Sequence, residues 1–155
     1  MWEIGILFTG LSLAITALFI AAALFLGIQV LSTLFARGGG WAKLAERFPA
    51  ATPPQGERRT MQTVELGGLV RYRWCVTVVM SPRGLYLALA SPILPKHSPM
   101  LIPWSEVKGV RCARLYWWLA VRLTIGEPPV STITVWLRLF EAMRPYLPAE
   151  LVQGT

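Results

Sequence analysis

Residues 4–36 form an unbroken run that contains no Asp, Glu, Lys, Arg or His. A transmembrane helix needs about 20 apolar residues, so this run is long enough to cross a bilayer. As a single helix its 33 residues would extend about 50 Å, whereas a hydrocarbon core is about 30 Å thick. We therefore expect one membrane-spanning helix that tilts or projects beyond the bilayer.

Two alternatives compete with a spanning helix. A cleaved signal peptide has a basic start and an apolar core of about 7 to 15 residues. Here the run is about twice that length, and only Met1, Trp2 and Glu3 precede it. The second alternative is a pair of short re-entrant pieces, with breaks at glycines such as Gly10 and Gly27.

The charges on either side of the run predict its orientation. The flank before it has Glu3 and no basic residue. The flank after it carries the basic residues Arg37, Lys43, Arg47, Arg58 and Arg59. Because basic residues favour the cytoplasmic side, we expect the N-terminus outside and the remainder of the chain in the cytoplasm.

Composition excludes several classes of protein. The chain of 155 residues is 54% hydrophobic and 15% charged, which is the opposite of a disordered sequence. Two cysteines cannot form a disulfide scaffold. All eight acidic residues are Glu, so chemistry that depends on Asp is excluded. The formal net charge is +7, which favours anionic surfaces as partners.

A short amphipathic helix is predicted after the glycines at 38–40. Trp41, Leu44, Ala45 and Phe48 recur at helical spacing, and the prolines that follow end the helix. This helix either lies at the membrane surface, with aromatic anchors beside basic residues, or packs on the following domain. The sequence leaves these two placements open.

The remainder of the chain changes to period-two alternation. Two longer strands are predicted over residues 70–80 and 115–125. Shorter strands are predicted over residues 61–66, 85–90, 100–102, 107–111 and 130–135, with an amphipathic helix over 136–147. In the second long strand, Trp117 and Trp118 point to opposite faces, so we expect one of them to be exposed. About seven short strands and one helix predict an α+β fold built on a small antiparallel barrel or sandwich.

Three segments resemble those of a known family. GLYL at residues 84–87 and LIPWSEVKGV at residues 101–110 look like the middle strands of bacterial PH-like and GRAM-like domains. GWAKLAERFP at residues 40–49 is similar to a segment that precedes such domains in small bacterial membrane proteins. Within LIPWSEVKGV, Trp104 is expected to be a large core anchor.

The resemblance implies a PH-like barrel with a C-terminal amphipathic helix, attached to a single transmembrane helix. The implied division is a transmembrane anchor at residues 1–37, a helix and Pro-rich linker at 38–59, and a PH-like domain at 60–155. The implied location is the bacterial cytoplasmic (inner) membrane. Lipid headgroup specificity does not carry over, because the loop at Gly67 and Gly68 has no Lys or Arg.

We find no constellation of residues that indicates catalysis. His97 is the only histidine and lies in a proline-rich loop, where we expect it to be solvated. Cys75 is either a thiol activated by a neighbouring arginine or a small half-buried apolar residue, and the second interpretation is favoured. No metal, cofactor or enzymatic activity is expected. Nucleic-acid binding is not expected either, because Arg71 and Arg73 alternate with Tyr72 and Trp74 on opposite faces.

The resulting hypothesis is a non-enzymatic accessory, assembly or stabilising subunit of a larger membrane complex, for which respiratory and photosynthetic complexes are examples. Its partners would be integral membrane protein subunits and the lipid bilayer. The alternative is a peripheral binder of anionic lipid headgroups. The candidate contact residues are Arg37, Trp41, Lys43, Arg47, Phe48, Trp117 and Trp118.

Overall fold

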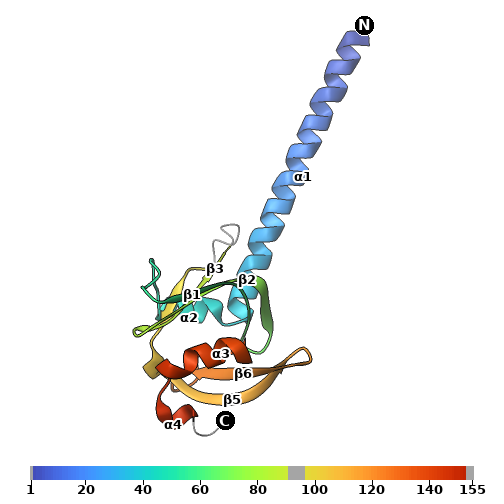
Figure 1. The fold of residues 1–155 in the computed structure, drawn as a ribbon. Coiled ribbons are helices and arrows are strands. Elements are labelled where there is room, and N and C mark those ends of the chain that lie inside the picture. Colours follow the sequence, from blue (N-terminus) through green and yellow to red (C-terminus); the bar gives the residue numbers. More distant parts are fainter. Residues whose placement is uncertain (1, 91–96, 153–155) are drawn as a thin grey trace.

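The computed structural model describes residues 2–90 and 97–152, with the side chains of residues 2–9 and 35–37 left aside. A single helix, α1 (Trp2–Gly38), stands away from a folded domain (Figure 1). Its segment Gly10–Leu34 is long and apolar enough to cross a membrane. Because α1 runs through Gly10 and Gly27 without interruption, two re-entrant pieces do not form.

The domain is built on one antiparallel sheet of seven strands that curls into a half-barrel (Figure 1). The strands are β1 (Glu57–Leu66), β2 (Val70–Ser81), β3 (Gly84–Leu89), β4 (Met100–Ile102), β5 (Val107–Leu115), β6 (Trp118–Ile125) and β7 (Ser131–Trp136). Their order in the sheet is β4-β3-β2-β1-β7-β6-β5. The expected α+β class is confirmed at this level.

The helices other than α1 are short: α2 (Trp41–Arg47), α3 (Leu137–Met143), α4 (Ala149–Val152) and two 3-10 turns, Trp104–Glu106 and Arg144–Tyr146. The helix predicted over residues 136–147 is therefore shorter than expected. Pro145 lacks the N–H that would continue α3, so the chain passes into a 3-10 turn there.

The strand predicted over residues 115–125 is present but begins later than predicted, at Trp118. Tyr116 and Trp117 form a tight turn between β5 and β6, and Leu115 pairs with Trp118 across it. The backbone φ of Tyr116 is +59°. The sequence gives no signal for this turn because aromatic residues occupy positions where Gly or Asn is usual. The first strand also begins earlier than predicted, at Glu57.

Two bulges bend the β1–β2 hairpin. The pairing register shifts between Arg59 and Gln62 and again between Gln62 and Val64, and φ is positive at Met61 (+56°) and Trp74 (+54°). A bulge re-aims side chains and increases local twist. As a result Trp74 is 61% exposed, although alternation placed it on the buried face.

Helix α2 packs into the domain core. Trp41, Leu44 and Ala45 are buried among the apolar side chains of the sheet. Of the two placements left open for this helix, packing on the domain is therefore the one adopted. Trp104 is buried as expected, donates from Nε1 to the Ser81 carbonyl at 2.7 Å, and stacks on a tyrosine ring.

Candidate functional site

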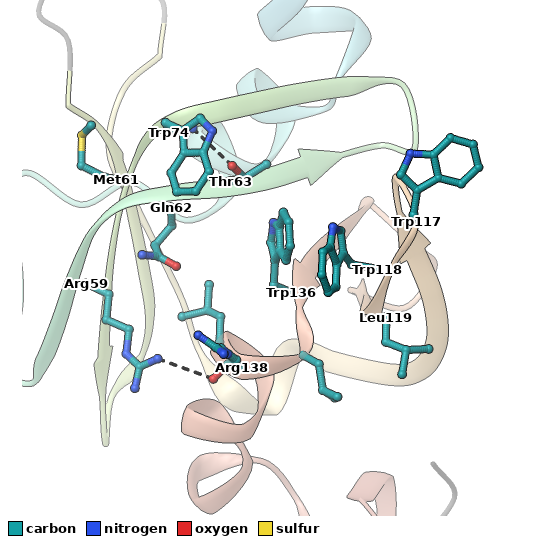
Figure 2. Close-up of a pocket in the computed structure, with 12 residues that line it drawn as sticks. Arg59, Met61, Gln62, Thr63, Trp74, Trp117, Trp118, Leu119, Trp136 and Arg138 are labelled. Atoms are coloured by element: carbon teal, nitrogen blue, oxygen red, sulfur yellow. Dashed lines mark hydrogen bonds between the residues drawn. The ribbon is translucent and has the colours of Figure 1, made fainter.

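A groove opens where β1 and β7 separate. The two strands pair only from Val64 to Leu66, and β1 continues toward its N-terminal end with β2 as its paired neighbour. β7 ends at Trp136 and the chain turns into α3. The groove between them has a volume of about 750 Å³ (Figure 2). Its lining residues are Arg59, Met61, Gln62, Thr63, Trp74, Trp117, Trp118, Leu119, Trp136, Leu137, Arg138 and Leu139.

Four of the seven tryptophans of the chain line this groove. Trp117 is 93% exposed, and Trp118 and Trp74 are more than half exposed. The rings of Trp118 and the half-buried Trp136 lie 6.5 Å apart (Figure 2). One of Trp117 and Trp118 was expected to be exposed, and both are, because they lie at the end of a hairpin rather than in the middle of a strand. We refer to this feature as the tryptophan groove.

Backbone strain is concentrated at the tryptophan groove. Within the described ranges, the non-glycine residues with positive φ are Met61, Trp74 and Tyr116. Met61 and Trp74 line the groove, and Tyr116 lines a smaller pocket that adjoins it. A left-handed conformation costs a bulky residue about 1–2 kcal/mol. Such strain gathers at functional sites, because the surrounding structure must hold it in place.

The groove is lined by cations and by no carboxylate. Arg59 and Arg138 belong to the lining, and Arg73 lines the adjoining pocket. Arg59 donates from Nη1 to the Arg138 carbonyl at 3.5 Å and pairs with Glu57 at 2.7 Å. The hydrogen bond from Arg59 to Arg138 joins β1 to the start of α3 across one end of the groove (Figure 2).

The β5–β6 turn is held against β2 by cation–π contacts. The Arg71 guanidinium lies 4.3 Å from the centre of the Tyr116 ring, and that of Arg73 lies 5.4 Å from it. Arg71 also donates to the buried Glu65 at 2.7 Å, a hydrogen bond that raises the pKa of Arg71. Glu65 lies 3.6 Å from Arg122 on its other side. Trp117 therefore sits on an anchored turn.

A second aromatic cluster joins α1 to the sheet. His97 is only 6% exposed, so the expectation of a solvated loop residue is wrong. Its Nε2 lies 3.0 Å from the Tyr72 hydroxyl and its Nδ1 lies 3.3 Å from the Ser32 hydroxyl. The rings of Trp41 and Tyr72 pack edge-on against the imidazole, each with its centre 5.4 Å away. We call Ser32, Trp41, Tyr72 and His97 the His97 cluster.

Burial sets the protonation states in and near this cluster. It lowers the pKa of His97, so the imidazole is neutral at pH 7 and is satisfied by two hydroxyl partners. Burial also raises the pKa of Tyr72, which therefore stays protonated. Cys75 is half-buried against the core and its pKa is raised by burial, so the interpretation as a small apolar residue is confirmed.

The other predicted contact residues with described side chains lie on or next to α2, outside the tryptophan groove. Lys43 is exposed, Arg47 lies 3.7 Å from Glu106, and Phe48 is half-buried against the core. Trp41 is fully buried and donates to a backbone carbonyl, so it offers no contact surface. The side chain of Arg37 lies outside the described ones.

Sequence reasoning placed Trp117 and Trp118 in the candidate set but missed Trp74, Trp136 and Arg138. The bulge that exposes Trp74 has no signature in the sequence, and Trp136 was assigned to the final helix. Within the described part of the chain, no group of three His, Cys, Asp or Glu side chains could hold a metal ion.

Comparison with protein-family models, curated proteins and solved structures gives no match to this chain. Function is therefore inferred from the geometry of its two aromatic clusters. The His97 cluster is closed, and its polar atoms are paired. The tryptophan groove is open, strained and cationic, so it is the candidate functional site.

Proposed function

We propose that this protein is a single-span membrane protein whose PH-like domain docks on another membrane protein, as a non-enzymatic accessory or assembly subunit. In this proposal α1 crosses the bacterial cytoplasmic membrane with its N-terminus outside. The domain then lies in the cytoplasm, because the basic residues follow the helix.

The observation that carries this proposal is the exposed tryptophan groove. Large apolar side chains that gather on a surface indicate an interaction site. Trp and Arg are the residues most enriched among those that dominate protein–protein binding energies, and the groove contains both. Trp117 is almost completely exposed on a turn fixed by cation–π contacts, so it is available at little ordering cost.

The fold supports the PH-like part of the proposal. Two antiparallel meanders, β1 to β4 and β5 to β7, meet through β1 and β7 and are followed by a short helix that packs on the core. That arrangement agrees with the family resemblance of the segments at residues 84–87 and 101–110. The His97 cluster would then fix the domain to the end of the membrane helix, so that both act as one unit.

Binding of anionic lipid headgroups is the second candidate function. It is favoured by the net charge of +7 and by Arg71 and Arg73, which lie against the ring of Tyr116, the residue before Trp117. Basic residues near an anionic leaflet contribute about 1 kcal/mol each. Its site would be the β5–β6 turn rather than the centre of the groove.

Native gel electrophoresis of the tagged full-length chain, extracted from its own membranes in mild detergent, tests the proposal. We expect the wild-type chain to migrate in a defined complex with stoichiometric membrane proteins. The double variant Trp117→Ala, Trp118→Ala should leave that complex, because it removes two of the exposed anchors. Arg83→Ala, in the exposed turn between β2 and β3, is the control that should remain in it.

A wild-type chain that migrates alone would contradict the accessory-subunit proposal. A complex that survives the double substitution would show that the tryptophan groove is not the contact. Flotation with anionic and neutral vesicles tests the second candidate function. Equal binding to both kinds of vesicle would exclude recognition of anionic headgroups.

A further inference from the structure

We propose that the tryptophan groove binds an extended segment of the partner protein in which apolar side chains alternate with carboxylates. This inference rests on the proposed function, because it specifies the chemistry of the partner at the same groove. It follows from three features of the groove: a strand edge, an apolar lining, and arginines with no carboxylate among the lining residues.

The strand edge is on β1. Pairing with β7 ends at Val64, while β1 extends to Glu57 and pairs with β2 along the other side. The side of this segment that faces the groove therefore presents backbone groups that a further strand can pair with. Strand addition of this kind supplies affinity through main-chain hydrogen bonds and specificity through alternate side chains. The edge is regular over Glu57–Arg59 and bulged between Arg59 and Val64, so an added strand would pair with the regular part and bend at the bulges. A helix would leave the edge unpaired.

The lining sets the side chains on one face of that segment. Trp74, Trp118 and Trp136 line the groove beside β1 (Figure 2). They offer aromatic surface to any side chain that points into the groove, and its volume of about 750 Å³ is within the usual range for binding clefts, about 300–1,000 Å³. Apolar side chains at every second position of an added strand would fill it.

The arginines of the groove predict the charge of the other positions of the partner segment. Arg138 is exposed and, among the described residues, forms no ion pair with a carboxylate. Arg59 and Arg73 lie on the strands that border the groove, and no carboxylate lines it. Carboxylates at the intervening positions would lie at the rim of the groove beside the exposed Arg138, and the same field would reject basic segments.

Two other occupants fit less well. A second copy of this chain would bring its own arginines and a net charge of +7 to a cationic groove. A bilayer is flat, whereas the half-buried Trp136 is recessed in the groove.

Peptide binding to the full-length protein in phosphatidylcholine nanodiscs tests the inference. The probes are three short fluorescein-labelled peptides in which Leu alternates with Glu, with Gln or with Lys, and fluorescence anisotropy reports binding. We expect the Leu/Glu peptide to bind about tenfold or more tightly than the other two, with an affinity that falls as salt is added.

Substitutions then locate the site. Arg138→Glu should weaken binding of the Leu/Glu peptide about tenfold and strengthen binding of the Leu/Lys peptide. Arg83→Glu makes the same charge change in the exposed β2–β3 turn and should leave all three peptides unaffected. Trp118→Ala should weaken every peptide that binds. Thermal unfolding of each variant verifies that it is folded.

Equal binding of the three peptides, no binding of any of them, or a Leu/Glu preference that survives Arg138→Glu would overturn the inference. Nanodiscs with brominated lipid test the bilayer as occupant: quenching of tryptophan fluorescence that disappears in the Trp117→Phe, Trp118→Phe variant would place this face in the membrane and also overturn it. The proposed function fails separately, when the wild-type chain migrates alone on the native gel. A chain that remains in its complex but ignores the acidic peptide contradicts only the present inference.

Discussion

Tyr72 and Trp74 lie two residues apart on β2 and end in opposite kinds of environment. In a regular strand they would share one face. Tyr72 is buried in the His97 cluster, where its hydroxyl contacts the imidazole, whereas Trp74 is exposed in the tryptophan groove. The difference arises from the bulge with positive φ at Trp74. This backbone conformation thus places one of the two rings in the structural cluster and the other in the groove available for binding.

The largest expected effect separates the two sets by stability. Trp41→Ala removes a fully buried ring and should lower the free energy of unfolding by about 3–5 kcal/mol. Trp117→Ala makes the same substitution at an almost fully exposed ring and should change it by less than about 0.5 kcal/mol. Chemical unfolding of the full-length chain in detergent measures both. Similar losses at the two positions would remove the distinction between the clusters.

Tyr72→Phe is the next largest effect and tests whether the hydrogen bonds of the His97 cluster matter. The substitution leaves the buried His97 Nε2 without its partner, which costs about 1–3 kcal/mol. Tyr146→Phe is the matched control, because Tyr146 contacts Trp104 by ring stacking. Thermal unfolding should therefore shift strongly for the first variant and little for the second. Equal shifts would mean that His97 is held by packing alone.

The sequence predicts the buried parts of the molecule better than the tryptophan groove. Hydropathy and alternation follow burial, so the apolar helix, most strands and the core residue Trp104 are recovered from them. The tryptophan groove depends on a turn and a bulge that no characteristic residue type marks in the sequence. A turn made of Tyr116 and Trp117 contains no Gly, Asn or Pro, and the bulge at Trp74 leaves alternation unchanged on either side.

The solvated placement expected for His97 fails for a related reason. A proline-rich loop indicates exposure when only neighbours in sequence are considered. His97 is covered by residues distant along the chain, including Ser32 on α1 and Trp41 on α2. Period-two or helical spacing does not predict contacts between α1 and the domain, so the cluster is seen only in the assembled fold.

Met61→Gly tests whether the backbone at the groove is strained. We expect a smaller change in stability than for the preceding variants, and a gain rather than a loss. Glycine adopts positive φ freely, so the substitution relieves about 1–2 kcal/mol and loses about 0.5–1 kcal/mol in chain entropy. We expect a net gain of about 0.5–1 kcal/mol in stability. Thr60→Gly, at the exposed preceding position of β1, should be destabilising. A loss of stability in Met61→Gly would contradict the strain argument.

The smallest effect is a pH dependence that belongs to the His97 cluster alone. Burial lowers the pKa of His97 in the folded chain, whereas in the unfolded chain it is about 6.5. Below that pH the unfolded state binds a proton that the folded state resists, so His97 makes stability fall as pH decreases through about 6.5 and has no effect above it. The groups that surround it, Ser32, Trp41 and Tyr72, do not titrate in this range. His97 is the only histidine, so unfolding of the wild type and of His97→Asn between about pH 7.5 and 5 isolates its contribution. The wild type should lose stability more steeply on acidification than the variant. Parallel curves would mean that the imidazole is as accessible to protons in the folded chain as in the unfolded one, and the contrast between a closed and an open aromatic cluster would then be lost.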